Sequence, residues 1–105
     1  MKSPKKLHIE PFTYSVDKRE GWARDTGNSA NCISDDQLII MDPNLSGQGE
    51  RETLLHEVLH AIWAQTTLNK IHDDEVEEAI VWTLAPRLLG FLKDNPEFVT
   101  WLVGR

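Results

Sequence analysis

Two histidines and a glutamate follow the pattern His-Glu-x-x-His at positions 56, 57 and 60. Residues four apart on a helix project from one face, so the rings of His56 and His60 can bind one metal ion. Glu57 points about 100° away from the first ring and can meet a water molecule on that metal from the side. Catalytic zinc sites need this set of groups, together with a third protein ligand and an open position for water.

The chemistry requires a helix, and the sequence predicts one from about Gln48 or Glu50 to Thr66. The two histidines lie at one border of its apolar arc, and Glu57 lies beyond them. The arc contains Leu54, Leu55, Val58, Leu59, Ala61, Ile62 and Trp63. We therefore expect the motif where the core gives way to a cleft. The alternative is a surface helix that carries two histidines by chance, and such a pair would more often lie in the middle of the polar face.

The third ligand must come from elsewhere in the chain. The metzincin pattern places a histidine six residues after the second motif histidine, and Thr66 at that position excludes it. The candidates are His72 and an acidic cluster of Glu75, Glu77 and Glu78. A carboxylate directed into apolar packing needs a partner, and a metal is one. Glutamates also favour the first turn of a helix without any ligand, so the choice stays open at this point.

A second helix is predicted from Asp73 or Asp74 to Lys93, with the aspartate as its cap and Pro86 as a kink. It is apolar on nearly all sides, so we expect it to be buried against several neighbours. Asn95 then caps a short third helix, with a proline in its first turn.

Tryptophans occur on the apolar faces of all three predicted helices, as Trp63, Trp82 and Trp101. This placement favours packing in the core. A metal-free helical interaction domain that uses them as a contact surface is a less favoured alternative.

The residue pattern in the first third of the chain predicts strands. Residues Lys6–Val16 alternate, with Pro11 marking an edge position or a bulge, and Gln37–Met41 is a short buried strand. The stretch between them predicts a loop, with a short strand around Asn31–Ile33. Strands followed by helices indicate an α+β domain, in which a small antiparallel sheet precedes two long helices and a short C-terminal helix. We expect a single domain over residues 1–105, with 1–5 as a flexible tail.

Composition excludes several classes of protein. The net charge of −6 argues against a nucleic-acid binder, and no apolar run approaches the length of a membrane span. The lysines near the start are not followed by the apolar stretch of a signal peptide. Cys32 is the single cysteine, which excludes an internal disulfide and favours the cytoplasm. We expect Cys32 to be a small buried side chain.

A glutamate on the helix after an HExxH helix resembles the gluzincins. More narrowly, the chain resembles the small ImmA/IrrE-like metallopeptidases of phages, prophages and bacteria. The segments that carry this resemblance cover nearly half the chain, and they are IIMDPNLSGQGERETLLHEVLHAIW, EEAIVWTLAPRLLGFL and DNPEFVTWL. In that family the second-helix ligand is commonly a glutamate followed by a small residue, which Glu78 and Ala79 match. The asparagine often found two residues after the ligand is replaced by Ile80.

The resemblance implies a zincin-like domain in which His56, His60 and Glu78 bind Zn²⁺ and Glu57 is the general base. Glu77 is the alternative ligand, and His72 would instead match a SprT-like site with three histidines. The implied activity is hydrolysis of a peptide bond in a protein or peptide substrate, such as a regulatory protein. The alternative is a zincin-fold metal-binding protein that acts as a non-catalytic interaction or regulatory factor.

Several supporting roles have more than one candidate. A donor to the oxyanion of the reaction could be Tyr14, Arg87 or His72. A carboxylate that orients a ligating histidine could be Asp42 or Glu52. A substrate strand could be added to the sheet at residues 6–16 or at residues 37–41.

Overall fold

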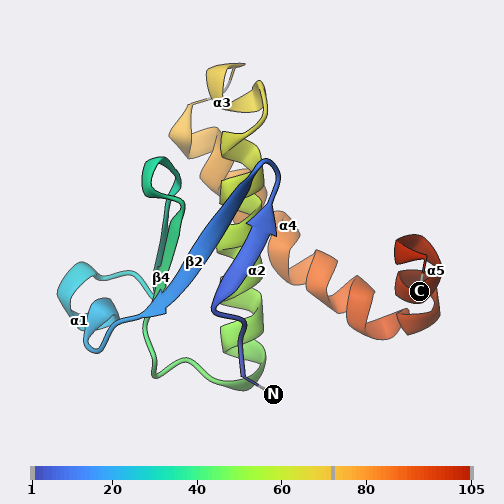
Figure 1. Cartoon of the computed structure of the whole chain (residues 1–105), viewed down its shortest axis with the longest axis horizontal. Helices are drawn as coiled ribbons and strands as arrows, with labels where there is room; N and C mark the ends of the chain where they lie inside the picture. Colours follow the sequence, from blue (N-terminus) through green and yellow to red (C-terminus); the bar gives the residue numbers. More distant parts are fainter. Residues whose placement is uncertain (1, 72, 105) are drawn as a thin grey trace.

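Strands come first along the chain and helices follow, so the α+β prediction is confirmed (Figure 1). The computed structural model describes residues 2–71 and 73–104. The strands are β1 (Lys6–Ile9), β2 (Phe12–Lys18), β3 (Ala30–Ile33) and β4 (Leu38–Met41). The helices are α1 (Trp22–Thr26), α2 (Gly47–Ala64), α3 (Leu68–Ile71), α4 (Asp74–Asp94) and α5 (Pro96–Val103), and a 3₁₀ turn, η1 (Ser34–Asp36), lies between β3 and β4.

The sheet has the strand order β1-β2-β4-β3 and is mixed. Its two hairpins, β1–β2 and β3–β4, are antiparallel, but β2 and β4 run parallel, with Val16 opposite Ile39. The prediction of an antiparallel sheet is therefore wrong for the central pair. The reason is the path of the chain: the segment that contains α1 carries it past the position beside β2, so β3 forms an edge. The hairpin then returns β4 into the gap, in the same direction as β2.

The predicted strand over residues 6–16 is two strands. Pro11 lies in the turn between β1 and β2, so it marks the end of pairing rather than an edge position or a bulge within one strand. The predicted loop before β3 contains the short helix α1. The expected strands around Asn31–Ile33 and Gln37–Met41 are confirmed as β3 and β4.

The core lies between one face of the sheet and α2. Side chains alternate along a strand, so Tyr14 and Val16 of β2 share a face with Ile39 and Met41 of β4. Ala61 of α2 packs against this face and is fully buried. The helix with the HExxH motif is therefore held directly on the sheet, in contact with β1 and β3 as well.

The helix α4 packs on α2, on the side away from the sheet (Figure 1). The carboxylate of Asp73 accepts a hydrogen bond of 2.9 Å from the backbone N–H of Val76, which confirms the predicted cap. The helix continues through Pro86 to Asp94. Among its described residues only Val81 and Ala85 are buried, so the prediction of burial on several sides is wrong. The physical reason is that α2 already covers the sheet face, and a chain of 105 residues supplies no further layer to cover α4.

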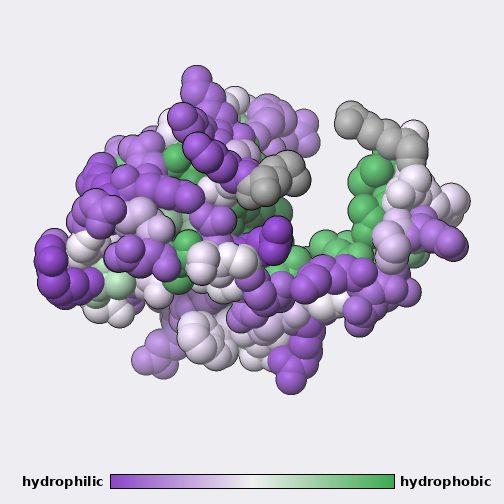
Figure 2. All heavy atoms as spheres, turned by 90° about the horizontal axis from the view of Figure 1, so that it is seen from below, coloured by the Kyte–Doolittle hydropathy of each residue, from purple (hydrophilic) through white to green (hydrophobic). Residues whose placement is uncertain are grey.

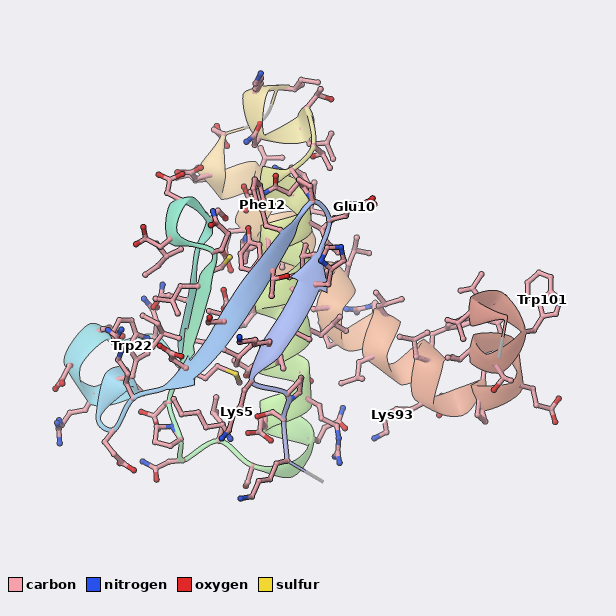
Figure 3. The ribbon with its side chains drawn as sticks, viewed as in Figure 1. Lys5, Glu10, Phe12, Trp22, Lys93 and Trp101 are labelled. Carbon is pink, nitrogen blue, oxygen red and sulfur yellow. The ribbon has the colours of Figure 1, made fainter. Side chains whose placement is uncertain are left out.

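The tryptophans of α2, α4 and α5 also differ in burial. Trp63 of α2 is buried, as predicted, whereas the side chains of Trp82 and Trp101 are 71% and 75% exposed. Core packing is therefore a wrong prediction for these two residues. Trp101 projects outward from α5 at the far end of the molecule (Figure 3). Within the described residues, none of the helices combines the length and the apolarity that crossing a membrane requires.

Candidate metal centre

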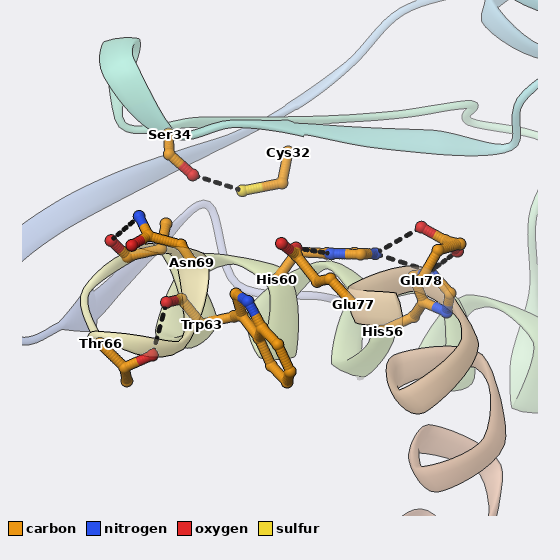
Figure 4. A network of polar contacts seen from close by, with 10 residues as sticks. Cys32, Ser34, His56, His60, Trp63, Thr66, Asn69, Glu77 and Glu78 are labelled. Atoms are coloured by element: carbon orange, nitrogen blue, oxygen red, sulfur yellow. Dashed lines mark hydrogen bonds and ion pairs between the residues drawn. The ribbon is translucent and has the colours of Figure 1, made fainter. Parts of the chain in front are cut away.

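The helix α2 presents His56 and His60 toward the first turns of α4 (Figure 4). The two Nε2 atoms lie 3.2 Å apart, and the ring centroids are separated by 4.9 Å. Both side chains are about 15% exposed, so the rings lie at the boundary of the core, as the helical wheel predicts. Two imidazole nitrogens are thus directed at a common point.

Glu78 of α4 closes the group. Its Oε1 lies 2.9 Å from Nε2 of His56, and its Oε2 lies 2.9 Å from Nε2 of His60. Donor atoms around a tetrahedral zinc ion with bonds of about 2.0 Å are roughly 3.3 Å apart, so these separations fit such an ion. His56, His60 and Glu78 are also the described residues whose donor atoms all lie within 4.8 Å of one another. Half of the Glu78 side chain is exposed, which leaves the point of convergence open to solvent.

Glu77 approaches His60 from the other side of its ring. The carboxylate Oε2 of Glu77 lies 2.5 Å from Nδ1 of His60. The tautomer of His60 decides which nitrogen donates: a metal on Nε2 would leave the proton on Nδ1, where the carboxylate of Glu77 accepts its hydrogen bond. Glu77 is therefore placed to orient this ring, a role that carboxylates commonly have beside the histidines of zinc sites. The adjacent glutamates 77 and 78 have different roles because neighbouring helical residues point about 100° apart.

The other candidates for these roles are Asp42, Glu52, Glu75 and His72. Asp42, a candidate for orienting a histidine, instead accepts hydrogen bonds from the backbone N–H groups of Ala23 and Asn44, at 2.8 and 2.9 Å. These bonds hold the pKa of Asp42 below its usual range and fix the end of β4 against α1. Glu52 lines the cleft beside the motif. Glu75 is exposed, and His72 lies outside the described residues.

Glu57 is buried beneath the edge strand β3, with 7% of its surface exposed. Loss of hydration raises its pKa to about 7, and the nearby charge of Glu78 acts in the same direction. His60 and a hydrogen bond from the backbone N–H of Cys32 partly oppose this shift. A carboxyl group with a pKa near neutrality is suited to accept and return a proton.

Burial also tunes His56. It lowers the pKa of the imidazole, with Glu78 opposing the shift, and so favours the neutral ring that a metal requires. Trp82 lies edge-on to this ring, with centroids 5.7 Å apart. Trp82 was predicted to pack in the core and not to contact the site, although its position one helical turn after Glu78 indicates this contact.

A cleft of about 960 Å³ opens between β3, α2 and α4. Two helices and one strand form its walls. The helical side is lined by His56, His60, Glu78, Glu57 and Trp82, and the sheet side is lined by Ala30, Asn31 and Cys32. Cys32 is half-buried rather than fully buried, and burial raises the pKa of its thiol.

The strand beside the cleft is β3, because its residues line the sheet side. The candidate strands for substrate addition were misplaced, because β1 forms the opposite edge of the sheet and β4 lies inside it.

Two of the three predicted oxyanion donors, Tyr14 and Arg87, are not brought to this cleft, and the third, His72, lies outside the described residues. The ring of Tyr14 is fully buried in the core, and its hydroxyl accepts a hydrogen bond from the side chain of Gln65 at 3.4 Å. Arg87 is exposed on α4, where it donates to the carbonyl of Thr83. Within the described part of the chain, neither Tyr14 nor Arg87 lines the cleft.

Comparisons with protein-family models, with curated proteins and with solved structures find no match. A functional assignment therefore rests on the geometry of the site and on the chemistry of its residues.

Proposed function

We propose that this chain is a zinc-dependent metallopeptidase, with Zn²⁺ held by His56, His60 and Glu78. One observation carries the proposal: two imidazoles and a carboxylate from different helices converge beside a buried glutamate that follows the first histidine. Burying ionisable groups costs free energy unless a partner compensates it, so their convergence is best explained by a bound cation.

Bound Zn²⁺ would polarise a substrate carbonyl and lower the pKa of a water molecule toward about 7. The chain itself supplies the proton transfers. Glu57, in its ionised form, accepts a proton from the attacking water and then returns it to the nitrogen of the departing amine. The carboxylate of Glu77 keeps the proton of His60 on Nδ1, which keeps Nε2 free for the metal.

An extended peptide is the substrate that the surroundings of the site favour. The strand β3 is an edge strand, and its residues Ala30, Asn31 and Cys32 line the cleft. Its outward backbone groups can pair with a peptide laid along it, as in other cases of strand addition. Such a peptide would lie along the open edge of β3, beside the side chain of His56. A reducing compartment such as the cytoplasm suits the single thiol of Cys32.

The decisive assay is hydrolysis of a fluorescently labelled, unstructured protein by the zinc-loaded chain. We expect cleavage that a chelator abolishes and that zinc restores. Glu57→Gln should bind zinc but lose activity by about 10²–10⁴-fold, because it removes the base and keeps the ligands. The matched control is Glu75→Gln, the same change at an exposed position of α4. Full activity in Glu57→Gln, or cleavage that is insensitive to the chelator, would reject the proposal.

A non-catalytic metal-binding factor with a zincin fold is the second candidate. The observation that favours it is the exposed apolar surface of Trp82, Trp101 and the C-terminal helices, which suits binding to another protein. The same assay separates the two functions, because a binding factor would hold one zinc ion and would not cleave the labelled protein.

A further inference from the structure

The C-terminal half of α4 and the whole of α5 extend away from the sheet as an arm, defined here as residues 84–103 (Figure 1). Leu84, Leu88 and Phe91 lie along one stripe of α4, at intervals of four and three residues. The stripe continues into α5 through Phe98, whose ring meets that of Phe91 edge to face at 5.3 Å. Trp101 follows, 5.9 Å from Phe98.

These apolar side chains face solvent. Leu84 is 53% exposed and Leu102 is 59% exposed. Figure 2 shows hydrophobic residues gathered on the side of the arm that faces the hollow between α5 and the body of the molecule. A continuous apolar surface of this kind on a water-exposed helix pair marks a site of protein association.

The total surface area of the chain is larger than that of a compact monomer of the same mass. The chain exposes 7420 Å², whereas a compact monomer of 12.0 kDa exposes roughly 6,000 Å². The excess exceeds the ~800 Å² per partner that a stable interface of standard size buries. The radius of gyration is 14.1 Å, against about 12.9 Å for a compact domain of this length, because the arm extends away from the body.

We propose that two copies of this chain associate through their arms, with α5 of each copy seated in the hollow of the other. The arrangement is self-complementary, because every chain carries both a protruding apolar helix and a hollow beside it that is lined by the apolar side of its own arm. Charge does not oppose it. The arm contains Arg87, Lys93, Asp94 and Glu97 and is therefore neutral, although the whole chain has a net charge of −6. This inference does not depend on the proposed peptidase function.

The test is the molar mass of the full chain in solution, measured by light scattering and sedimentation over a dilution series. We expect twice the 12.0 kDa of one chain, with dissociation on dilution. The double variant Leu84→Ser/Leu102→Ser should weaken the association at least about tenfold for each substitution, since buried leucines contribute strongly to an interface.

The matched control is Ile71→Ser, which changes an aliphatic side chain that is 67% exposed on α3, outside the arm. It should dimerise as the wild type does. Dilution of the wild type tests the proposal even if the double variant fails to fold. A wild type that is monomeric at every concentration would overturn the proposal, whether the arm folds back on its own chain or serves another protein. A double variant that dimerises as tightly as the wild type would also overturn it.

Discussion

The two ends of α4 expose their side chains in opposite ways. At its start, Glu77 and Glu78 meet two largely buried histidines beside the buried Glu57. Toward its end, Leu84, Leu88 and Phe91 lie in solvent. One end thus gathers ionisable groups around two largely buried rings, and the other exposes apolar groups where hydration is unfavourable.

Each arrangement costs free energy in the isolated chain, but the compensation differs. Carboxylates and imidazoles directed at one point are compensated by a cation. Apolar side chains on one stripe are compensated by another apolar surface. The proposed metal would compensate the first half of the helix, and the proposed second copy of the chain would compensate the second half. The two can therefore be disrupted separately.

The largest effect should follow from His60→Ala. Removal of one imidazole leaves two ligands, so bound zinc should fall from about one ion per chain to nearly none. Metal analysis after dialysis measures this, with the exposed His8 of β1 changed to alanine as the control. The dimer mass should not change, because His60 lies on α2, outside the arm. Zinc retained at one ion per chain would contradict the ligand assignment.

The next effect concerns the metal-free protein. The raised pKa of Glu57 means that the folded chain holds a proton which the unfolded chain has already lost. Its contribution to stability is therefore complete below about pH 4.5 and is lost as the pH rises to about 7, by roughly 3 kcal/mol at most. Glu57→Gln should remove this slope.

Urea unfolding of the chelator-treated protein at pH 5 and pH 8 measures the difference. The lowered pKa of His56 gives a slope of the opposite sign, so the wild type must be compared with the variant at each pH. Glu75→Gln should keep the wild-type dependence. If the free energy of unfolding changed with pH in the same way for the wild type and Glu57→Gln, burial of this carboxyl would have no free-energy cost.

A smaller effect is expected for Glu77→Gln. The loss of the charged partner of His60 should weaken zinc binding by about 10- to 100-fold while one ion per chain still binds. Competition with a chromogenic chelator gives the affinity, and Glu75→Gln is again the control. An unchanged affinity would remove Glu77 from the site, and a lost stoichiometry would make it a ligand.

The smallest predicted effect concerns the residues at the N-caps of α4 and α5. Asp73→Ala removes the hydrogen bond to Val76 at the start of α4 and should cost about 1 kcal/mol. Asn95→Ala should change stability by less than about 0.5 kcal/mol, because its exposed side chain donates back to the carbonyl of Phe91. Thermal unfolding measures both, and equal losses would contradict this ranking.

Local periodicity was enough to predict the helices α2, α4 and α5, the strands β3 and β4 and the common face of His56 and His60, because each depends on neighbours in sequence. The parallel pairing of β2 with β4 depends on the path of a long connection, which no local pattern specifies. The angle at which α4 crosses α2 decides that Glu78 meets both histidines and Glu77 only one. The apolar pattern of α4 could not distinguish a face covered by the same chain from one left for another.

The central claim is tested most directly by a crystal structure of the zinc-loaded protein, with the metal located by its anomalous scattering. The account predicts one zinc ion bound to Nε2 of His56, Nε2 of His60 and the carboxylate of Glu78, with Glu77 on Nδ1 of His60. Zinc bound elsewhere, or a coordination sphere that excludes Glu78, would contradict it.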